Sequence, residues 1–296
     1  MNQFWNSHHP YALITIICWS IANVYTRLAV LYYTPEALGF LRYAIASAAV
    51  LCLLPFVKPR LRLPKSRDIK WFFAAGGTGF FLYMLFFNKG CQTVPAAAVS
   101  VIIATAPVLT ALFARFIYKE KLDGIRWFAI LVEFLGVAAL VLMDGLVSLN
   151  PGMLWVLLAA LALSLYNLLQ RKLTRAYTAM ETSAYSIFAG TLLLSIFLPE
   201  ASGQLPAAPQ EQIFYLLLLG IFSGAVAYIS WAKAFSKAKK ASSVSNYMFL
   251  TPFVTSLLGF VAAGERLDRA TLIGGGVILL GLVLFYFGGA VRGVKT

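Results

Sequence analysis

Two segments of this chain are diverged copies of one sequence. The segment VSVIIATAPVLTALFARFIYKEKLDG, which begins at Val99, recurs as VSNYMFLTPFVTSLLGFVAAGERLDR, which begins at Val244. The copies align without a gap at a spacing of 145 positions, so that Pro107 matches Pro252. A repeated half restricts the fold to architectures in which two similar modules pack on each other.

The repeat also covers the earlier part of each copy. Asn23 matches Asn167 at a spacing of 144 positions, which is one less than in the later segments. Because the matches are distributed along most of the chain, the sequence predicts two modules, residues 1–148 and residues 149–296.

The composition places both modules in a lipid bilayer. Hydrophobic residues make up 60% of the chain and charged residues 12%, with a mean hydropathy of +0.81. A soluble domain of this composition would expose more apolar surface than one core can bury. Segments of roughly 18 or more residues with few charges can span the hydrocarbon layer as helices. Ten are expected, approximately over residues 11–31, 35–57, 69–87, 96–117, 125–143, 153–173, 182–198, 213–233, 244–263 and 272–289.

The positive charges lie in alternate loops. Of the 24 Lys and Arg residues, 19 follow even-numbered spans, and the others are assigned to the opposite side: Arg27, Arg42, Lys89, Arg266 and Arg269. The positive-inside rule therefore predicts a multi-pass protein of the plasma membrane with both termini in the cytoplasm. Because five spans is an odd number, the second module starts on the opposite side. The predicted fold is an all-α integral membrane protein with ten transmembrane helices, arranged as two inverted five-helix repeats.

Several motifs resemble those of the EamA-type carriers of the drug/metabolite transporter superfamily. They are Trp19 early in the first span, the stretch PEALGFLR that begins at Pro35, and the doubled elements APVLTALFARFIYKEKL and TPFVTSLLGFVAAGERL. This resemblance implies a central cavity built from spans one to four and six to nine, with spans five and ten at the periphery. It also implies transport of small metabolites, often export of amino acids. The sequence departs from the family pattern at Asn88, Lys89 and Glu133.

Polar and aromatic side chains within the spans are candidates for solute binding. Those expected to bind substrate are Trp19, Asn23, Tyr83, Asn167, Gln170, Tyr228, Trp231, Asn246 and Tyr247. Polar groups that face lipid are unfavourable, so they should face other helices or a cavity. Tyr and Trp combine a flat apolar surface with a polar tip, which suits amphipathic solutes and organic cations. The alternatives are hydrogen bonds between helices for the Asn residues and anchoring at the membrane interface for the aromatic residues. Arg27 and Arg171 lie near span ends, where they can also reach the water phase.

Two matching prolines are expected to lie inside spans. Pro107 and Pro252 each remove one backbone hydrogen bond, which bends or loosens a helix. They are either a pair of hinges, one for each side of the membrane, or static kinks.

Three carboxylates stand out against the apolar background. Glu133 interrupts the fifth span near its middle, where it is either a neutral carboxyl at a helix interface or a residue that couples transport to protons. Glu120 and its repeat match Glu265 precede the next spans, and they are expected to cap those helices or to pair locally.

No signature of a cofactor, a metal site or nucleotide hydrolysis is found. His8 and His9 are the only histidines, the three cysteines lack paired spacing, and no GxxxxGK[ST] motif occurs. The net charge of +13 reflects the loops and does not predict nucleic-acid binding. Gly274, Gly275, Gly276 and Gly281 allow close helix packing, either within a monomer or in a homodimer.

The sequence therefore predicts a secondary active transporter that moves small organic metabolites by alternating access. Amino acids or related amphipathic solutes are the expected substrates, with export as the expected direction and a proton or another ion as a possible coupling partner. A multidrug or organic-cation efflux carrier is the alternative. An intramembrane enzyme or a channel is disfavoured, because catalytic motifs and oligomeric pore patterns are missing.

Overall fold

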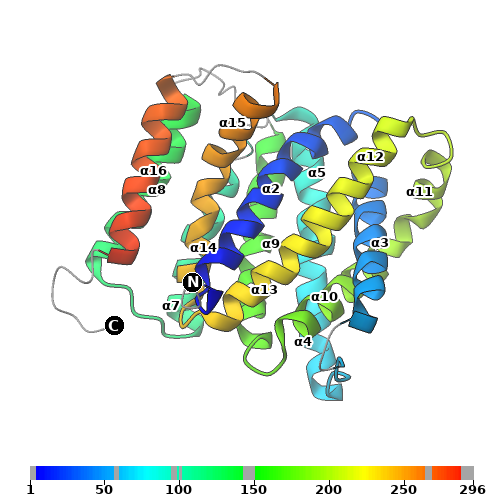
Figure 1. Ribbon diagram of the computed structural model, residues 1–296, viewed down its shortest axis with the longest axis horizontal. Helices are drawn as coiled ribbons and strands as arrows, with labels where there is room; N and C mark the ends of the chain where they lie inside the picture. The colour runs from blue at the N-terminus through cyan, green and yellow to red at the C-terminus, as the bar shows by residue number, and fades with distance from the viewer. Residues whose placement is uncertain are drawn as a thin grey trace.

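The computed structural model describes residues 5–56, 60–94, 99, 102–142, 151–263 and 269–287 of the chain. Over these residues the regular elements are all helical (Figure 1). The main helices of the first half are α2 (His9–Ala29), α3 (Pro35–Leu53), α4 (Ser66–Gly76), α5 (Tyr83–Thr93), α7 (Thr105–Ile117) and α8 (Gly124–Leu142). Those of the second half are α9 (Gly152–Leu173), α10 (Ala179–Leu194), α11 (Leu198–Gln204), α12 (Gln210–Leu218), α13 (Ala227–Lys237), α14 (Ala241–Ser245), α15 (Leu250–Ala263) and α16 (Arg269–Phe287).

Short helices of other types connect some of these elements. The 3-10 helices are η1 (Leu54–Phe56), η3 (Ser195–Phe197) and η5 (Asn246–Phe249), and the π-helices are η2 (Gly77–Leu82) and η4 (Leu219–Val226). Six continuous helical stretches within the described ranges are long and apolar enough to cross a bilayer: His9–Ala29, Pro35–Phe56, Ser66–Thr93, Gly152–Leu173, Ala179–Gln204 and Gln210–Lys237. Thr105–Ile117 and Leu272–Phe287 are shorter apolar helices. The all-α membrane fold is thus confirmed, while the number of ten spans stays a prediction.

The second span of each half begins with the same cap. The Thr34 hydroxyl accepts a hydrogen bond from the backbone N–H of Ala37 at 3.3 Å, and the Thr178 hydroxyl accepts one from that of Glu181 at 3.2 Å. Thr34 and Thr178 are 144 positions apart. A threonine at the N-cap satisfies a backbone donor that the helix itself leaves free. The repeated sequence therefore starts the same helix in the same way in both halves.

Small residues let the halves approach closely at two matching places. A Cβ atom on Gly76 would lie 2.6 Å from the backbone N of Gly190, and one on Gly224 would lie 2.8 Å from Cβ of Ala46. Ala46 and Gly190 are themselves repeat matches, 144 positions apart. The third span of the first half therefore contacts α10 much as the eighth expected span contacts α3. In both third spans the contact includes a π-helix, η2 or η4.

An approximate two-fold relation between the halves follows from side-chain pairs. Ser47 on α3 and Thr191 on α10 are 144 positions apart, and their hydroxyl oxygens share a hydrogen bond of 2.8 Å. A residue that touches its own repeat match lies beside the axis that relates the two copies. The halves are therefore related by a pseudo-two-fold axis that passes between α3 and α10.

The peripheral helices obey the same relation. α8 and α16 pack side by side at one edge of the bundle (Figure 1). A Cβ atom on Gly136 would meet Ile278, and one on its match Gly281 would meet Glu133. Because Glu133 and Ile278 are also 145 positions apart, the carboxyl occupies the place that an aliphatic side chain takes in the other half.

The centre of the bundle is built by both halves together. α2 packs against α13 and α15, and its counterpart α9 packs against α5 and α7. Each half thus places its first helix on the third and fourth spans of the other half. A group bound between these helices would contact both modules.

Basic loops that are far apart in sequence meet at one end of the bundle. Lys240 Nζ donates to the Lys121 carbonyl at 2.9 Å, and the Tyr177 hydroxyl accepts from the Lys65 backbone N–H at 3.1 Å. Arg171, at the end of α9, donates to the backbone just after α13. The loops after α3, α7, α9 and α13 therefore share one end, as the alternation of charge in the sequence requires.

Candidate functional site

Aromatic side chains from both halves meet inside the bundle. We name Trp19, Tyr43, Phe80, Tyr166, Tyr228 and Trp231 the aromatic centre. The Tyr228 ring centroid lies 4.6 Å from that of Phe80 and 5.4 Å from that of Trp19, mostly in tilted or edge-on geometry. All members except Trp19 are fully buried. Such packing is favourable for aromatic rings, and it forms a surface that suits the apolar body of a solute.

A buried amide joins the aromatic centre to two other helices. Trp231 Nε1 donates to Asn167 Oδ1 at 2.9 Å, and Asn167 Nδ2 donates to Thr110 Oγ1 at 3.2 Å. Asn167 has no exposed surface, so these bonds satisfy polar atoms that water does not reach. In this conformation Asn167 therefore links α7, α9 and α13. The sequence indicated the polar residue but not its partners.

Two further candidates border the aromatic centre. Gln170 is buried, and its Nε2 donates to the Tyr166 hydroxyl one helical turn away. Tyr83 is partly buried and stacks on Phe87 with ring centroids 5.4 Å apart. Neither residue is exposed to a large cavity, so both would contact a solute only after the helices move.

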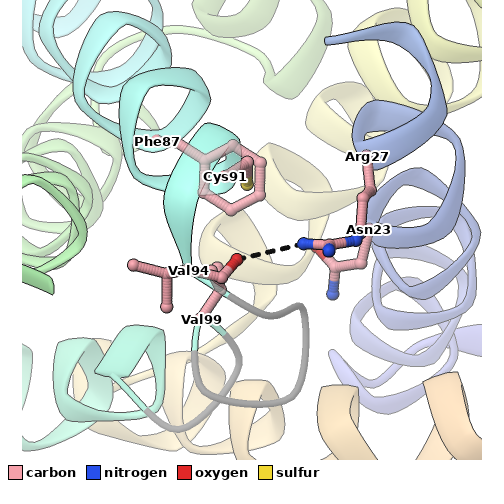
Figure 2. Close-up of a pocket in the computed structure, with 6 residues that line it drawn as sticks. All are labelled: Asn23, Arg27, Phe87, Cys91, Val94 and Val99. Carbon is pink, nitrogen blue, oxygen red and sulfur yellow. Dashed lines mark hydrogen bonds between the residues drawn. The ribbon is translucent and has the colours of Figure 1, made fainter. Parts of the chain in front are cut away.

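Asn23 lies apart from this cluster, beside a small cavity between α2 and α5. We name it the α2–α5 cavity, and Asn23, Arg27, Phe87, Cys91, Val94 and Val99 line it (Figure 2). Its volume of about 10 Å³ is enough for roughly one water molecule. Arg27 is exposed, and its Nη1 donates to the Val94 carbonyl at 3.2 Å (Figure 2). The cavity is thus too small for a metabolite in this conformation.

The same arginine contact occurs in the other half. Arg171 Nη1 donates to the Ala238 carbonyl at 3.0 Å, and Arg171 and Ala238 each follow their counterparts Arg27 and Val94 by 144 positions. In each half the first helix is thereby tied to the end of the third span of the same half. Arg171 is buried, whereas Arg27 is exposed. The end of the bundle near Arg171 is therefore more tightly closed than the end near Arg27.

Glu120 closes the end that carries the basic loops. Its Oε1 lies 3.1 Å from Arg171 Nε and accepts from the Ala241 backbone N–H at 2.8 Å, while its Oε2 accepts from Ser242 Oγ at 3.2 Å. The expectation that Glu120 pairs locally is wrong, since all of these partners belong to the other half. Local sequence did not show that α7 ends beside the ends of α9 and α13. Glu265 lies outside the described residues.

Asn246 and Tyr247 face away from the aromatic centre. Asn246 Nδ2 donates to Glu133 Oε1 at 2.8 Å, and Glu133 is completely buried where α8, α16 and η5 meet. The Tyr247 hydroxyl pairs with Nδ1 of His9 at the start of α2. Burial, together with the neighbouring His9, lowers the pKa of His8 to about 4. Because Glu133 is buried among α8, α16 and η5, it lies at a helix interface, as one of the two sequence interpretations proposed. The alternative, that Glu133 couples transport to protons, stays a prediction.

The two prolines occupy the same position relative to a helix break. Pro107 is the third residue of α7, which follows a turn at Ala104, and Pro252 is the third residue of α15, which follows the 3-10 helix η5. In the first turn of a helix the missing N–H of proline removes no internal hydrogen bond. Both prolines therefore mark interrupted spans, and their role as hinges remains a prediction.

Sequence reasoning missed one buried charge near the aromatic centre. The charge pattern assigns Arg42 to the cations on the side opposite the basic loops, but it is only 3% exposed and donates to Ser223 Oγ on η4. A cation well inside an apolar span was the available signal. Tyr43, Tyr166 and Phe80 gave no such signal, because aromatic residues are abundant throughout the chain.

Comparison with known proteins identifies relatives over nearly the whole chain. An uncharacterized transporter, YdfC, of Bacillus subtilis is 29% identical, covering 91% of this chain and 87% of the relative. A probable terminal-alkyne amino-acid exporter of Streptantibioticus cattleyicolor is 28% identical, with 92% and 91% covered. An S-adenosylmethionine uptake transporter of Rickettsia bellii is 25% identical, with 83% and 81% covered.

Structural similarity extends equally far. A solved crystal structure superposes with a TM-score of 0.79 at 20% sequence identity, covering 97% of this chain and 99% of that chain. The sequence model of the EamA-like transporter family matches residues 7–142 and again residues 150–287. This multi-pass membrane protein therefore belongs to the EamA-like transporter family.

Proposed function

We propose that the protein is a secondary active carrier that exports small amphipathic solutes of the amino-acid class by alternating access. The observation that carries this proposal is the position of the aromatic centre and Asn167, which lie where α2, α7, α9 and α13 of the two halves meet. A solute bound there would be held by both modules. Movement of one module against the other would then expose it to either side in turn.

The names of two relatives support the solute class. One is named as an exporter of a terminal-alkyne amino acid and another as an uptake transporter of S-adenosylmethionine, and both solutes contain an amino-acid group. Export is proposed because the exporter shares more of its length and sequence with this chain. The closely packed aromatic rings of the aromatic centre suit a solute with an apolar side chain.

Closure at the end with the basic loops supports the alternating mechanism. Glu120 joins that end of α7 to Arg171 and to the start of α14 in the other half. The α2–α5 cavity lies elsewhere, beside the opposite end of α2. We infer a plasma-membrane protein with both termini in the cytoplasm, so that this conformation is closed toward the cytoplasm.

The driving force is proposed to be an ion or solute gradient, since the sequence has no nucleotide-binding motif. A proton is one candidate ion, and Glu133 is the buried carboxyl available to it. The functional unit is proposed to be the monomer. Gly275 and Gly281, which were candidates for a dimer surface, pack against Phe253 and Glu133 of the same chain.

Solute counterflow tests the carrier function. Proteoliposomes that contain the purified protein would be loaded with one unlabelled proteinogenic amino acid at a time, and uptake of the same radiolabelled amino acid would be measured. The same assay with tetraphenylphosphonium would test an organic cation. Saturable counterflow of an amino acid is expected. Counterflow of the cation alone would favour organic-cation efflux, whereas unsaturable flux or no flux would refute the carrier.

Accessibility of terminal tags tests the topology. Short epitope tags at both ends should react with antibody only after the cell membrane is made permeable. Tags on opposite faces of the membrane would contradict two inverted five-helix repeats.

A further inference from the structure

Arg42 is a buried cation for which the described residues supply no counter-charge. It is the eighth residue of α3, which places it about 10 Å along the helix axis from Pro35. Its Nη2 donates to the neutral Ser223 hydroxyl, and its Nε has no hydrogen-bond partner. In the part of the chain that the structure describes, no carboxylate lies within ion-pair distance of Arg42.

An unpaired buried charge is costly, so its presence calls for a reason. Burying a charged side chain in the membrane interior costs on the order of several kcal/mol unless the charge is paired or hydrated. Arg171 is also buried, but its charge is compensated by the Glu120 carboxylate 3.1 Å away. Arg42 has no such partner among the residues that the structure describes.

The repeat shows that the fold does not require this arginine. The position that matches Arg42 at a spacing of 144 is Ser186, which is buried on α10. The second half therefore forms the equivalent helix with a small neutral side chain. No ion pair within the described residues accounts for Arg42, and a ligand that carries a negative charge would supply the missing partner.

The position of Arg42 agrees with a ligand site. Its guanidinium carbon lies 5.8 Å from the ring centroid of Tyr43 in the aromatic centre. The Tyr43 ring centroid in turn lies 6.1 Å from that of Tyr228, a candidate for solute binding. Arg42 thus borders the aromatic centre through Tyr43.

We propose that Arg42 binds the carboxylate of the transported solute, while the apolar body of the solute contacts the aromatic centre. A guanidinium presents parallel N–H groups that match the two oxygens of a carboxylate, and the free Nε of Arg42 is one of them. When α3 and η4 separate, Arg42 gives up its hydrogen bond to Ser223 and forms the stronger, charged hydrogen bonds to the solute carboxylate. Ser223 belongs to the π-helix η4, a type of segment that is often found at functional sites.

This inference rests on the proposed carrier function and specifies its substrate class as monocarboxylates with an apolar body, including apolar amino acids. Counterflow would be measured for the best-transported amino acid, for its carboxamide and for the amine that lacks the carboxyl group. The proteins would be the wild type, Arg42→Gln, Arg42→Lys, and Arg115→Gln as a control at an exposed arginine. Each variant would first be checked for a monodisperse elution profile.

The wild type should prefer the carboxylate to the carboxamide by at least about tenfold in KM, because a site built for a charged group rejects the analogue without it. In Arg42→Gln the KM for the amino acid should rise to that of the carboxamide, with little change for the carboxamide itself. Arg42→Lys should retain part of the preference, and Arg115→Gln all of it.

Equal transport of acid and amide by the wild type would overturn the inference and leave the carrier intact. Unchanged preference in Arg42→Gln would do the same. If Arg42→Gln does not fold, Arg42→Lys decides, since an unaltered preference there excludes the bidentate contact. Loss of all saturable flux in the wild type would overturn the carrier and the inference together.

Discussion

The Glu120 carboxylate on one half lies 3.1 Å from the Arg171 guanidinium on the other, and both side chains are buried. Glu120 also accepts from the backbone of Ala241 and the hydroxyl of Ser242, so one carboxylate holds three groups of the second half. This carboxylate therefore links the modules at the end with the basic loops through one ion pair and two hydrogen bonds, and hydrogen bonds to a charged group are stronger than neutral ones.

Removal of the Glu120 charge should open that end of the bundle. Glu120→Gln leaves Arg171 as an uncompensated buried charge, which is destabilising by about 3–5 kcal/mol. A cysteine introduced at buried Ser245, in a background without the three native cysteines, should then react faster with an impermeant thiol reagent in Glu120→Gln than in its parent.

The matched control for this experiment is Asp123→Asn. Asp123 pairs with Arg126 at the same corner, but this pair is more exposed and is therefore worth little. Equal labelling of Ser245→Cys in all three backgrounds would show that Glu120 does not hold this end closed.

The hydrogen bond between Trp231 and Asn167 should matter for transport. Trp231→Phe keeps an aromatic ring but leaves Asn167 Oδ1 without its donor, a loss of about 1–3 kcal/mol for a buried acceptor. We expect the KM for the transported amino acid to rise by roughly tenfold, which corresponds to about 1.4 kcal/mol. Trp155→Phe, at a partly exposed tryptophan that stacks on Phe86, is the control and should leave KM unchanged. An equal effect of both substitutions would argue against a specific site.

The contact between Gly76 and Gly190 should limit what either position tolerates. Gly190→Val would place new atoms within 3 Å of Phe80 and its helix, so overpacking should lower the free energy of unfolding by about 1–3 kcal/mol. Thermal unfolding in detergent measures the loss. Gly276→Ala, where no atom lies near the added Cβ, should leave the melting temperature unchanged. A stable Gly190→Val protein would contradict the close approach of α4 and α10.

The prolines at the helix breaks should affect rate more than affinity. Proline cannot donate a backbone hydrogen bond, so it prevents the helix from continuing through the preceding turn, and Pro107→Ala and Pro252→Ala should make the interrupted spans more continuous and stiffer. We expect slower counterflow with little change in KM in at least one of the two variants. Unchanged rates in both would identify the prolines as static kinks.

Glu133 should act as an interface residue. Glu133→Gln retains the shape of the side chain and can still accept from Asn246, so folded yield and transport should persist. Uptake driven by an imposed pH gradient measures the alternative role. Loss of pH-driven uptake with normal yield would instead show that this carboxyl couples transport to protons.

The sequence by itself determined the membrane environment, the two copies and their helical character. Apolar composition forces the chain into a bilayer, where only helices or closed barrels satisfy the backbone. Thr34 and Thr178 start matching helices because a cap depends on residues three positions away. Spacing alone also paired Gly136 with Gly281.

The tertiary structure decided which polar and aromatic residues meet. Asn167 joins Trp231 at the aromatic centre while Asn246 faces Glu133, although both asparagines lie in apolar spans. Glu120 pairs with Arg171 of the other half, and rules that consider only neighbouring residues in the sequence cannot predict such a partner. The reason is physical: helix formation depends on neighbours within one turn, whereas the partner of a buried side chain depends on how the two halves cross, which the linear sequence does not record.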